Sequence, residues 1–329
     1  MREFATAAMV LWASFAWADT PDVTASVTHH VLPGYDLLVQ NTQALAATAE
    51  QECSASSPDL IQAYHRAFDS WISVSHLRFG PSESEDRAFA LAFWPDPRGS
   101  TPKALSALIG AQDPAVRVPD AFRTVSVAAR GFYALDFLLF DAQFTTDATA
   151  YTCALIQAVT TDIAANALAI RNGWLNGYAD LMLMPGNDTY RTANEAAKQL
   201  FTALVTGLEF TSSMRLGRPL GTFERPRPKR AEARRSGRSL RHVILSLAAT
   251  RDLALRLSSS DPDIAQAFDT AIMRAERLDD PIFASVSTPQ GRLQVEILQQ
   301  NVDMLLQRLT EQVGPSLGIE AGFNSLDGD

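Results

Sequence analysis

Apolar residues recur at intervals of three and four along much of the chain, which is the spacing of one face of an amphipathic α-helix. The pattern is clearest in two windows, at Leu60, Tyr64, Phe68, Trp71 and Ile72 and at Leu293, Ile297, Met304, Leu305 and Leu309. The Ala-rich windows 147–175 and 190–215 also have high helix propensity. No stretch alternates apolar and polar residues over more than about four positions, as a half-buried strand would. The sequence therefore predicts an all-α fold.

Helix starts are marked by a residue that can cap a helix and is followed directly by proline. The cap oxygen accepts a hydrogen bond from a free backbone N–H, and proline fits the first helical position because no N–H is needed there. Five such pairs occur, Ser57-Pro58, Thr101-Pro102, Asp261-Pro262, Asp280-Pro281 and Thr288-Pro289. We expect a helix to begin at each of them.

Two turn-rich segments, residues 80–101 and 217–237, interrupt the helical pattern, and loops of this length in compact folds tend to be functional or mobile. The second is basic, so it is either a solvated arm whose charges pair with the acidic remainder or a polyanion site; we favour the arm. A polar stretch at 141–147 suggests two helical bundles, residues 19–145 and 146–329, packed as one compact unit.

The first 18 residues have the composition of an export signal. An apolar stretch from Phe4 to Ala18 follows Arg2, and Ala16 and Ala18 place small residues at both recognition positions of a signal peptidase. The alternative is a short buried helix. Cleavage after Ala18 removes one Arg and one Glu, so the net charge stays at −9, which disfavours nucleic-acid binding. No later stretch reaches the ~20 uninterrupted apolar residues of a membrane span. We therefore expect a soluble periplasmic protein.

That compartment changes the interpretation of the two cysteines, Cys53 and Cys153. Cysteines in an oxidising compartment usually pair when the fold brings their Cα atoms within ~7 Å. Two separate buried thiols are the alternative. We expect a disulfide between Cys53 and Cys153.

The decapeptide from Gly131 to Phe140 is the strongest chemical anomaly in the sequence. Its residues are all apolar or aromatic apart from Asp136 and the hydroxyl of Tyr133. A helix that is apolar on every side is a buried one, so a carboxylate there needs an arginine, hydrogen-bond donors or a cation. Tyr133 lies three residues before Asp136, so both side chains emerge from the same face.

The decapeptide resembles the signature helix of the imelysin family, bacterial envelope proteins implicated in iron uptake and once described as metallopeptidases. The family pattern is G-x-H-x-x-E, whereas Tyr133 and Asp136 stand here in the places of the His and the Glu. Further stretches resemble the family in the same order: 77–81 (LRFGP), 93–96 (FWPD), 235–240 (RSGRSL) and 322–329 (GFNSLDGD). The resemblance implies an all-α fold of two helical bundles, with the signature helix lining a site.

The departures from the pattern change the chemistry that such a site can offer. A phenolate and a carboxylate are hard oxygen donors, so Tyr133 and Asp136 would suit ferric iron if further ligands exist. Asp96, His65 and His76 are the candidates to complete the set. His65, Asp69 and His76 share one helix face. His65 and His76 are ~16 Å apart along the helix, so one ion cannot contact both of them. They can equally be polar residues on a solvated face, and the Tyr133–Asp136 pair can equally be a degenerate, structural remnant.

These observations support three hypotheses about function. The first is an imelysin-like periplasmic protein in an iron- or metal-linked envelope process, binding a metal or a small ligand rather than catalysing. The second is a metal-dependent peptidase, which the missing H-E-x-x-H motif disfavours. The third is a partner-binding scaffold with a retired metal site, which would dock an envelope redox or iron-transport protein through residues 217–237. His29 and His30 are adjacent in the sequence, and no other feature of the sequence points to a role for them.

Overall fold

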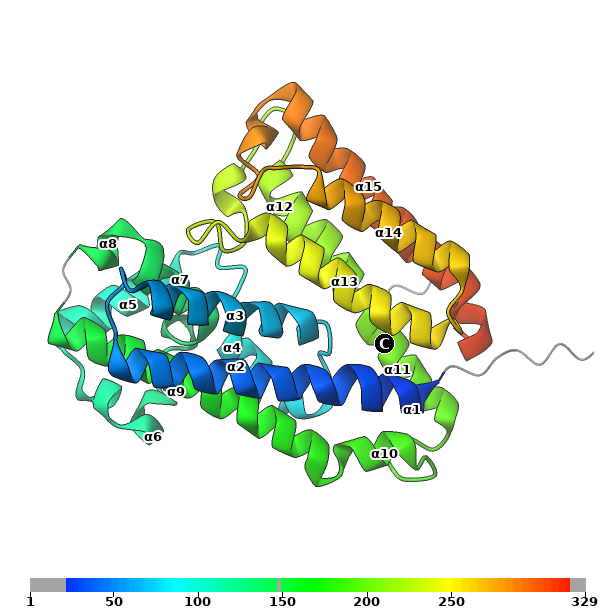
Figure 1. Ribbon diagram of the computed structural model, residues 1–329, viewed down its shortest axis with the longest axis horizontal. Helices are drawn as coiled ribbons and strands as arrows, with labels where there is room; N and C mark the ends of the chain where they lie inside the picture. Colours follow the sequence, from blue (N-terminus) through cyan, green and yellow to red (C-terminus); the bar gives the residue numbers. More distant parts are fainter. Residues whose placement is uncertain (1–21, 147–148, 320–329) are drawn as a thin grey trace, which may run out of the picture.

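The computed structural model describes residues 22–146 and 149–319, and regular structure in these ranges is helical throughout (Figure 1). A single isolated bridge between Thr222 and Arg225 is the only β pairing in these ranges. The all-α prediction is thereby confirmed. The predicted export signal, residues 1–18, lies outside the described residues.

The first group of helices surrounds α2 (Leu32–Gln51), which lies between α3 (Pro58–Val74) and α9 (Ala150–Gly173). The signature helix α7 (Gly131–Phe140) packs against α9 and α5 (Ser100–Ala111). Shorter helices complete the group: α1 (Val23–Ser26), α4 (Arg87–Leu91), α6 (Pro119–Phe122), α8 (Ala142–Thr145) and α10 (Ala179–Leu183).

The second group contains α11 (Ala193–Phe210), α12 (Gly217–Leu220), α13 (Ser239–Leu257), α14 (Pro262–Glu276) and α15 (Pro289–Gln312). Helix α13 packs against α14 and α11 and also against α3, so it joins the two groups (Figure 1). Because α9 packs with α2 and α7, the expected boundary at 145–146 falls inside the first group rather than between the two. The long helices that follow α10 pack mainly against one another, so the division between the two groups lies after α10. Buried apolar residues of both groups form one continuous core.

Three of the five predicted cap–proline pairs begin a helix. Ser57, Asp261 and Thr288 each accept a hydrogen bond from a backbone N–H in the first turn of α3, α14 and α15. The other two expectations were wrong. Helix α5 begins one residue before Thr101, and Asp280 accepts bonds from Ala284 and Ser285 at a short 3₁₀ turn. In both cases the local cap is an aspartate four residues before the turn, because its side chain reaches two successive N–H groups.

One apolar stretch, Ala150–Leu183, is long and apolar enough to pass a membrane-span test by length and composition. Its first part is α9, which packs against α2 and α7, and the core helix of a globular protein passes the same test.

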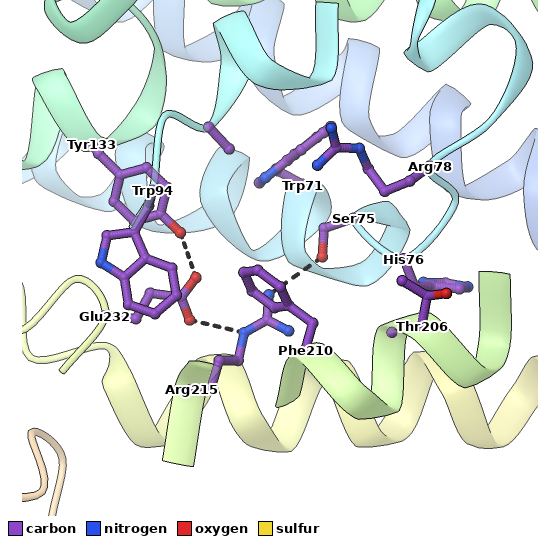
Figure 2. Close-up of a pocket in the computed structure, with 12 residues that line it drawn as sticks. Trp71, Ser75, His76, Arg78, Trp94, Tyr133, Thr206, Phe210, Arg215 and Glu232 are labelled. Carbon is purple, nitrogen blue, oxygen red and sulfur yellow. Dashed lines mark hydrogen bonds and ion pairs between the residues drawn. The ribbon is translucent and has the colours of Figure 1, made fainter. Parts of the chain in front are cut away.

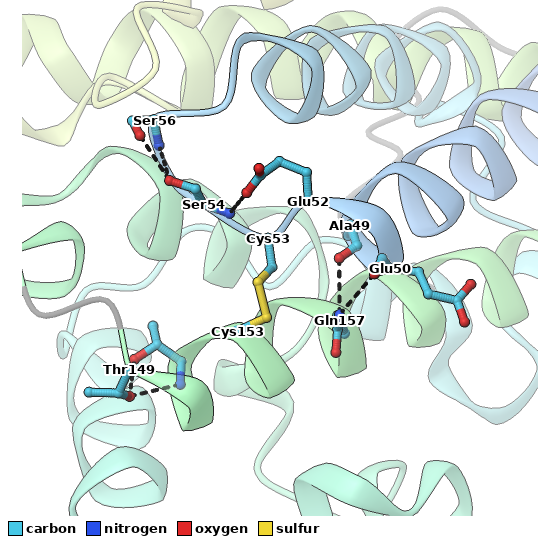
Figure 3. Close-up of a disulfide and its surroundings, with 10 residues drawn as sticks. Ala49, Glu50, Glu52, Cys53, Ser54, Ser56, Thr149, Cys153 and Gln157 are labelled. Atoms are coloured by element: carbon cyan, nitrogen blue, oxygen red, sulfur yellow. Dashed lines mark hydrogen bonds between the residues drawn. A yellow bond between two sulfur atoms is a disulfide. The ribbon is translucent and has the colours of Figure 1, made fainter.

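The predicted disulfide between Cys53 and Cys153 is present (Figure 3). It ties the segment after α2 to the first turn of α9, with 5.2 Å between the two Cα atoms and 100 residues between the cysteines in sequence. Nearby, Gln157 of α9 donates to the carbonyl oxygen of Ala49 at the end of α2. The bond therefore links two helices that already pack together.

Replacing both cysteines with alanine should lower the free energy of unfolding by about 2–5 kcal/mol, because a long loop is no longer closed in the unfolded chain. Urea denaturation of the oxidised protein and the double variant measures this difference. Adding reductant should destabilise the wild type and leave the double variant unchanged. Equal stability of the two proteins would show that the bond does not stabilise the fold.

Candidate functional site

The glycine that begins α7 is required by the backbone around it. Gly131 has φ of +74°, and a Cβ atom added to it would lie 2.3 Å from the carbonyl oxygens of Ala90 and Leu91. No side chain can be accommodated there, since both atoms belong to the backbone. This close contact fixes α7 against the end of α4 and thereby positions Tyr133 and Asp136.

Tyr133 is buried and donates its hydroxyl hydrogen to Glu232 (Figure 2). Glu232 is only 1% exposed, and its other oxygen accepts a hydrogen bond from Nε of Arg215 at 2.8 Å. Arg215 is also buried and donates through Nη1 to Ser246 at 3.0 Å and to Thr211 at 3.2 Å. The partner of Tyr133 is therefore an acid that is itself neutralised by a buried guanidinium.

The electrostatics keep this cluster in one ionisation state. Burial alone would raise the pKa of Glu232, but Arg215 and His242 outweigh it and lower the pKa to about 2. Burial and the charge of Glu232 raise the pKa of Tyr133 well above 10. At neutral pH the cluster thus holds a phenol, a carboxylate and a guanidinium, and its formal charge is zero.

His242 lies beside the same oxygen of Glu232 that Arg215 binds. Its Nε2 accepts a hydrogen bond from Nε of Arg238 at 3.1 Å, so the ring proton is on Nδ1. That nitrogen lies 3.1 Å from Glu232 Oε2, a contact too poorly directed to count as a hydrogen bond. Burial lowers the pKa of His242 to about 4 despite the nearby carboxylate.

Asp136 forms a separate cluster beside the first one. Its Oδ1 accepts hydrogen bonds from Ser236 at 2.5 Å and from Tyr64 at 3.0 Å. Burial raises the pKa of Asp136, although both donors and the charge of Arg235 oppose that rise. One oxygen of the buried carboxylate is thus satisfied by two hydroxyl groups.

The basic segment 217–237 is a solvated arm only in part. Residues 221–225, 229 and 230 are exposed, whereas residues 231–233, which include Glu232, are buried. Arg235 pairs with Asp141 at 2.5 Å and lies over the ring of Phe137. Just beyond the segment, the buried Arg238 also pairs with an acidic residue.

His65 and Asp69 of α3 both bind Arg238, whose side chain is 2% exposed. Its Nη1 donates to His65 Nδ1 at 2.8 Å and its Nη2 donates to Asp69, which also pairs with Arg241. Burial, together with the charge of Arg238, lowers the pKa of His65 to about 4. His65 therefore accepts a hydrogen bond from an arginine, and this contact occupies the lone pair a metal would need.

A cavity of about 240 Å³ lies between the two groups of helices. Its wall includes four aromatic side chains, and one side is closed by the cluster of Tyr133, Glu232 and Arg215 (Figure 2). His76 and Thr206 lie at the other side of the same view, and Ser75 accepts a hydrogen bond from Arg215 of the cluster. The aromatic residues are Trp71 of α3, Trp94, Tyr133 of α7 and Phe210 of α11.

The five predicted metal ligands are not brought together. Tyr133 and His76 line the cavity, whereas His65 and Asp136 do not. Asp96 accepts hydrogen bonds from the backbone N–H groups of Ser100 and Thr101 at 2.9 and 2.8 Å and so caps α5. In residues 22–146 and 149–319, no three His, Cys, Asp or Glu side chains are grouped so that they could hold a metal ion.

The expectation of a solvated helix face is wrong for His76, which is 4% exposed. Sequence reasoning also missed Glu232, Arg215 and His242, the residues that surround Tyr133. Two signals in the sequence could have identified part of this cluster. Glu232 is an acid within a basic segment, and Arg238 lies in a stretch that resembles the family. Arg215 and His242 carry no comparable signal.

Comparison with known proteins places the chain in a family. The sequence profile described as imelysin matches residues 31–309. The chain belongs to the imelysin family. An iron-regulated protein A of Synechococcus elongatus is 26% identical over 298 residues, which cover 84% of this chain and 79% of the relative.

Two solved structures share the imelysin fold. One is an imelysin-like protein from Psychrobacter arcticum, with a TM-score of 0.77 and 18% identity, covering 92% of this chain and 96% of the other. The second is a putative iron-regulated protein A precursor from Parabacteroides distasonis, with a TM-score of 0.73 and 15% identity, covering 91% and 97%. At these identities the likeness concerns the fold alone.

Within this imelysin, the residue at the His position of the family pattern fits a cation poorly. Tyr133 keeps its proton because its hydroxyl donates a hydrogen bond to Glu232, whereas the two hydroxyl donors to Asp136 both contact Oδ1. A metal at the Tyr133 oxygen would have to displace Glu232, which would then lose a hydrogen bond.

Changing Glu232 to Gln should destabilise the protein by about 3 kcal/mol, because Arg215 would remain buried with no counter-charge. Glu83→Gln is the matched control, since the Arg78–Glu83 pair has a similar geometry but is more than 40% exposed on both sides. The control should change stability by less than about 1 kcal/mol. Urea denaturation measures both, and equal effects would contradict the role assigned to the buried pair.

Stability should also depend on pH through His242. The folded-state pKa of about 4 lies below the ordinary 6.5, so between these values the unfolded chain binds a proton that the folded protein does not. Lowering the pH from 6.5 to 4 therefore costs stability, by up to ~1.4 kcal/mol per pH unit for this group.

The measurement is the slope of unfolding free energy against pH in wild type and in His242→Gln. The slope should become smaller in the variant. The exposed His29, changed to Gln, serves as the control and should leave the slope as it is. An unchanged slope in His242→Gln would mean that this ring is not held neutral by the fold.

Proposed function

We propose that this imelysin is a periplasmic binding protein in an iron- or metal-linked envelope process, and that it holds a small organic ligand in the cavity rather than transforming it. The observation that carries the proposal is the cavity itself, about 240 Å³ in volume and lined by Tyr133 of the signature helix. A cavity of ~150 Å³ with apolar walls is already large enough for benzene.

The composition of the wall favours an organic ligand over a bare ion. Trp71, Trp94 and Phe210 offer flat apolar surfaces, which is typical of small-molecule sites. The charged groups at the closed end, Glu232 and Arg215, neutralise each other. This pair therefore does not require a counter-charge from the ligand, so a neutral, partly aromatic molecule is suited to this end of the cavity.

The iron-linked part of the proposal rests on the name of the relative from Synechococcus elongatus. The periplasmic location is supported by the apolar residues 4–18 and by the disulfide between Cys53 and Cys153, because such bonds persist in oxidising compartments.

The proposal predicts that a ligand co-purifies with the protein and leaves when the cavity is filled. Ala92 lines the cavity, so Ala92→Phe should remove most of the bound ligand. Ala165→Phe is the matched control, because Ala165 lines a different cavity beside α9. Native mass spectrometry of protein purified from its own cells gives the mass of any complex, and elemental analysis gives its metal content.

A ligand mass present in the wild type and in Ala165→Phe but lost in Ala92→Phe would support the proposal. A ligand retained by Ala92→Phe would place binding elsewhere. Stoichiometric metal with no organic component would favour a metal-binding protein instead.

A further inference from the structure

Three side chains from distant parts of the chain form a hydrogen-bonded row that ends at the cavity. Asp252 of α13 lies with its Oδ2 2.7 Å from Nδ1 of His30, and Nε2 of His30 lies 3.0 Å from Nε2 of His76. His30 belongs to the π-helical turn Val27–Val31, and its side chain is 7% exposed. Asp252 is half exposed and is held from its own helix by Arg256.

The direction of each hydrogen bond follows from the acceptor at the start of the row. An ionised carboxylate can only accept, so Nδ1 of His30 carries a proton and donates it to Asp252. In the state in which His30 is neutral, its Nε2 then carries no proton. In that state the hydrogen between the two rings comes from His76, whose proton is on Nε2.

The remaining nitrogen of His76, Nδ1, is thus left with a lone pair. Nδ1 of His76 has no hydrogen-bond partner among the described residues. The fully buried polar atoms that lack a partner in these residues do not include it. His76 lines the cavity, and its Cβ lies directly over Gly207, where an added Cβ would be 2.6 Å away. The ring is therefore held in place by packing as well as by His30.

The charged groups around His76 support a neutral ring. Arg215 of η7 (Thr211–Leu216) approaches it from the second group of helices, and Arg78 lines the same cavity. Both are cations, whereas the charge of Asp252 acts in the opposite sense and favours a protonated ring. Burial is the largest cause, and together with the charge of Arg215 it lowers the pKa of His76 well below 6.5.

We propose that Asp252 and His30 are positioning residues that fix the tautomer of His76, so that its Nδ1 serves as a hydrogen-bond acceptor for the ligand in the cavity. This inference rests on the proposed function and narrows the ligand class. The ligand is an aromatic or similarly flat molecule that presents an O–H or N–H donor to Nδ1, with its apolar body between Trp71, Trp94 and Phe210.

The first test is the tautomer itself, which needs no ligand. Long-range ¹H–¹⁵N correlation spectra of the full chain, assigned with His30→Gln and His76→Gln, report which ring nitrogen carries the proton. The wild type should show His76 protonated at Nε2 and His30 protonated at Nδ1. In Asp252→Ala, His30 loses its acceptor, so His76 should no longer hold a single tautomer.

The matched control is Asp269→Ala, which deletes another half-exposed aspartate paired with an arginine of α13. It should leave both rings unchanged. A wild-type His76 protonated at Nδ1, a doubly protonated His30 at neutral pH, or an unchanged spectrum in Asp252→Ala would overturn the proposal.

The second test measures selectivity with two probes of nearly equal shape, phenol and toluene. The ratio of their affinities should fall about fivefold in Asp252→Ala relative to wild type, the effect of one ordinary hydrogen bond, and should not change in Asp269→Ala. If both probes bind and the ratio is the same in all three proteins, this inference fails while the cavity remains a binding site. If neither probe binds the wild type, the inference and the proposed function both fail.

Discussion

The structure depends on a carboxylate that is almost completely buried, that of Glu232. An uncompensated charge at Glu232 would cost several kcal/mol, so the fold surrounds it with a guanidinium, a phenol and an imidazole. These partners come from η7, α7 and α13. Tyr133 belongs to the first group of helices and the other three residues to the second, so a hydrogen bond to a buried carboxylate joins the two groups in addition to apolar packing. The geometry of the cavity wall follows from that contact.

This arrangement gives the cavity its chemical character. Arg215 supplies, from within the chain, the positive charge that a carboxylate among apolar helices requires. Tyr133, at the position of the family histidine, is consequently a protonated hydrogen-bond donor in this structure. The cavity wall combines aromatic surface with hydroxyl and imidazole groups, the Arg215–Glu232 pair and the guanidinium of Arg78. Such a wall is suited to a small polar aromatic molecule, and His76 at the far side adds an acceptor.

The sequence predicted the features that depend on local pattern. Helical periodicity predicted α3 and α15, and the solitary acid in an apolar decapeptide correctly pointed to a buried carboxylate at Asp136. The pairing partners could not be predicted, because they depend on the packing of distant segments: Tyr133 meets Glu232 across 99 residues and His30 meets Asp252 across 222. A basic segment usually indicates a solvated surface, and here that expectation holds for residues 221–225 but not for residues 231–233, which include the buried acid Glu232.

The most direct test of this account is the visible absorption spectrum of the protein during titration with ferric iron. A tyrosine oxygen bound to Fe(III) produces a charge-transfer band. Because Glu232 holds the hydroxyl of Tyr133, the wild type should develop no such band, and its spectrum should match that of Tyr133→Phe. A band that grows to one iron per protein and is lost in Tyr133→Phe would contradict the account, since the phenol would then be a metal ligand after all.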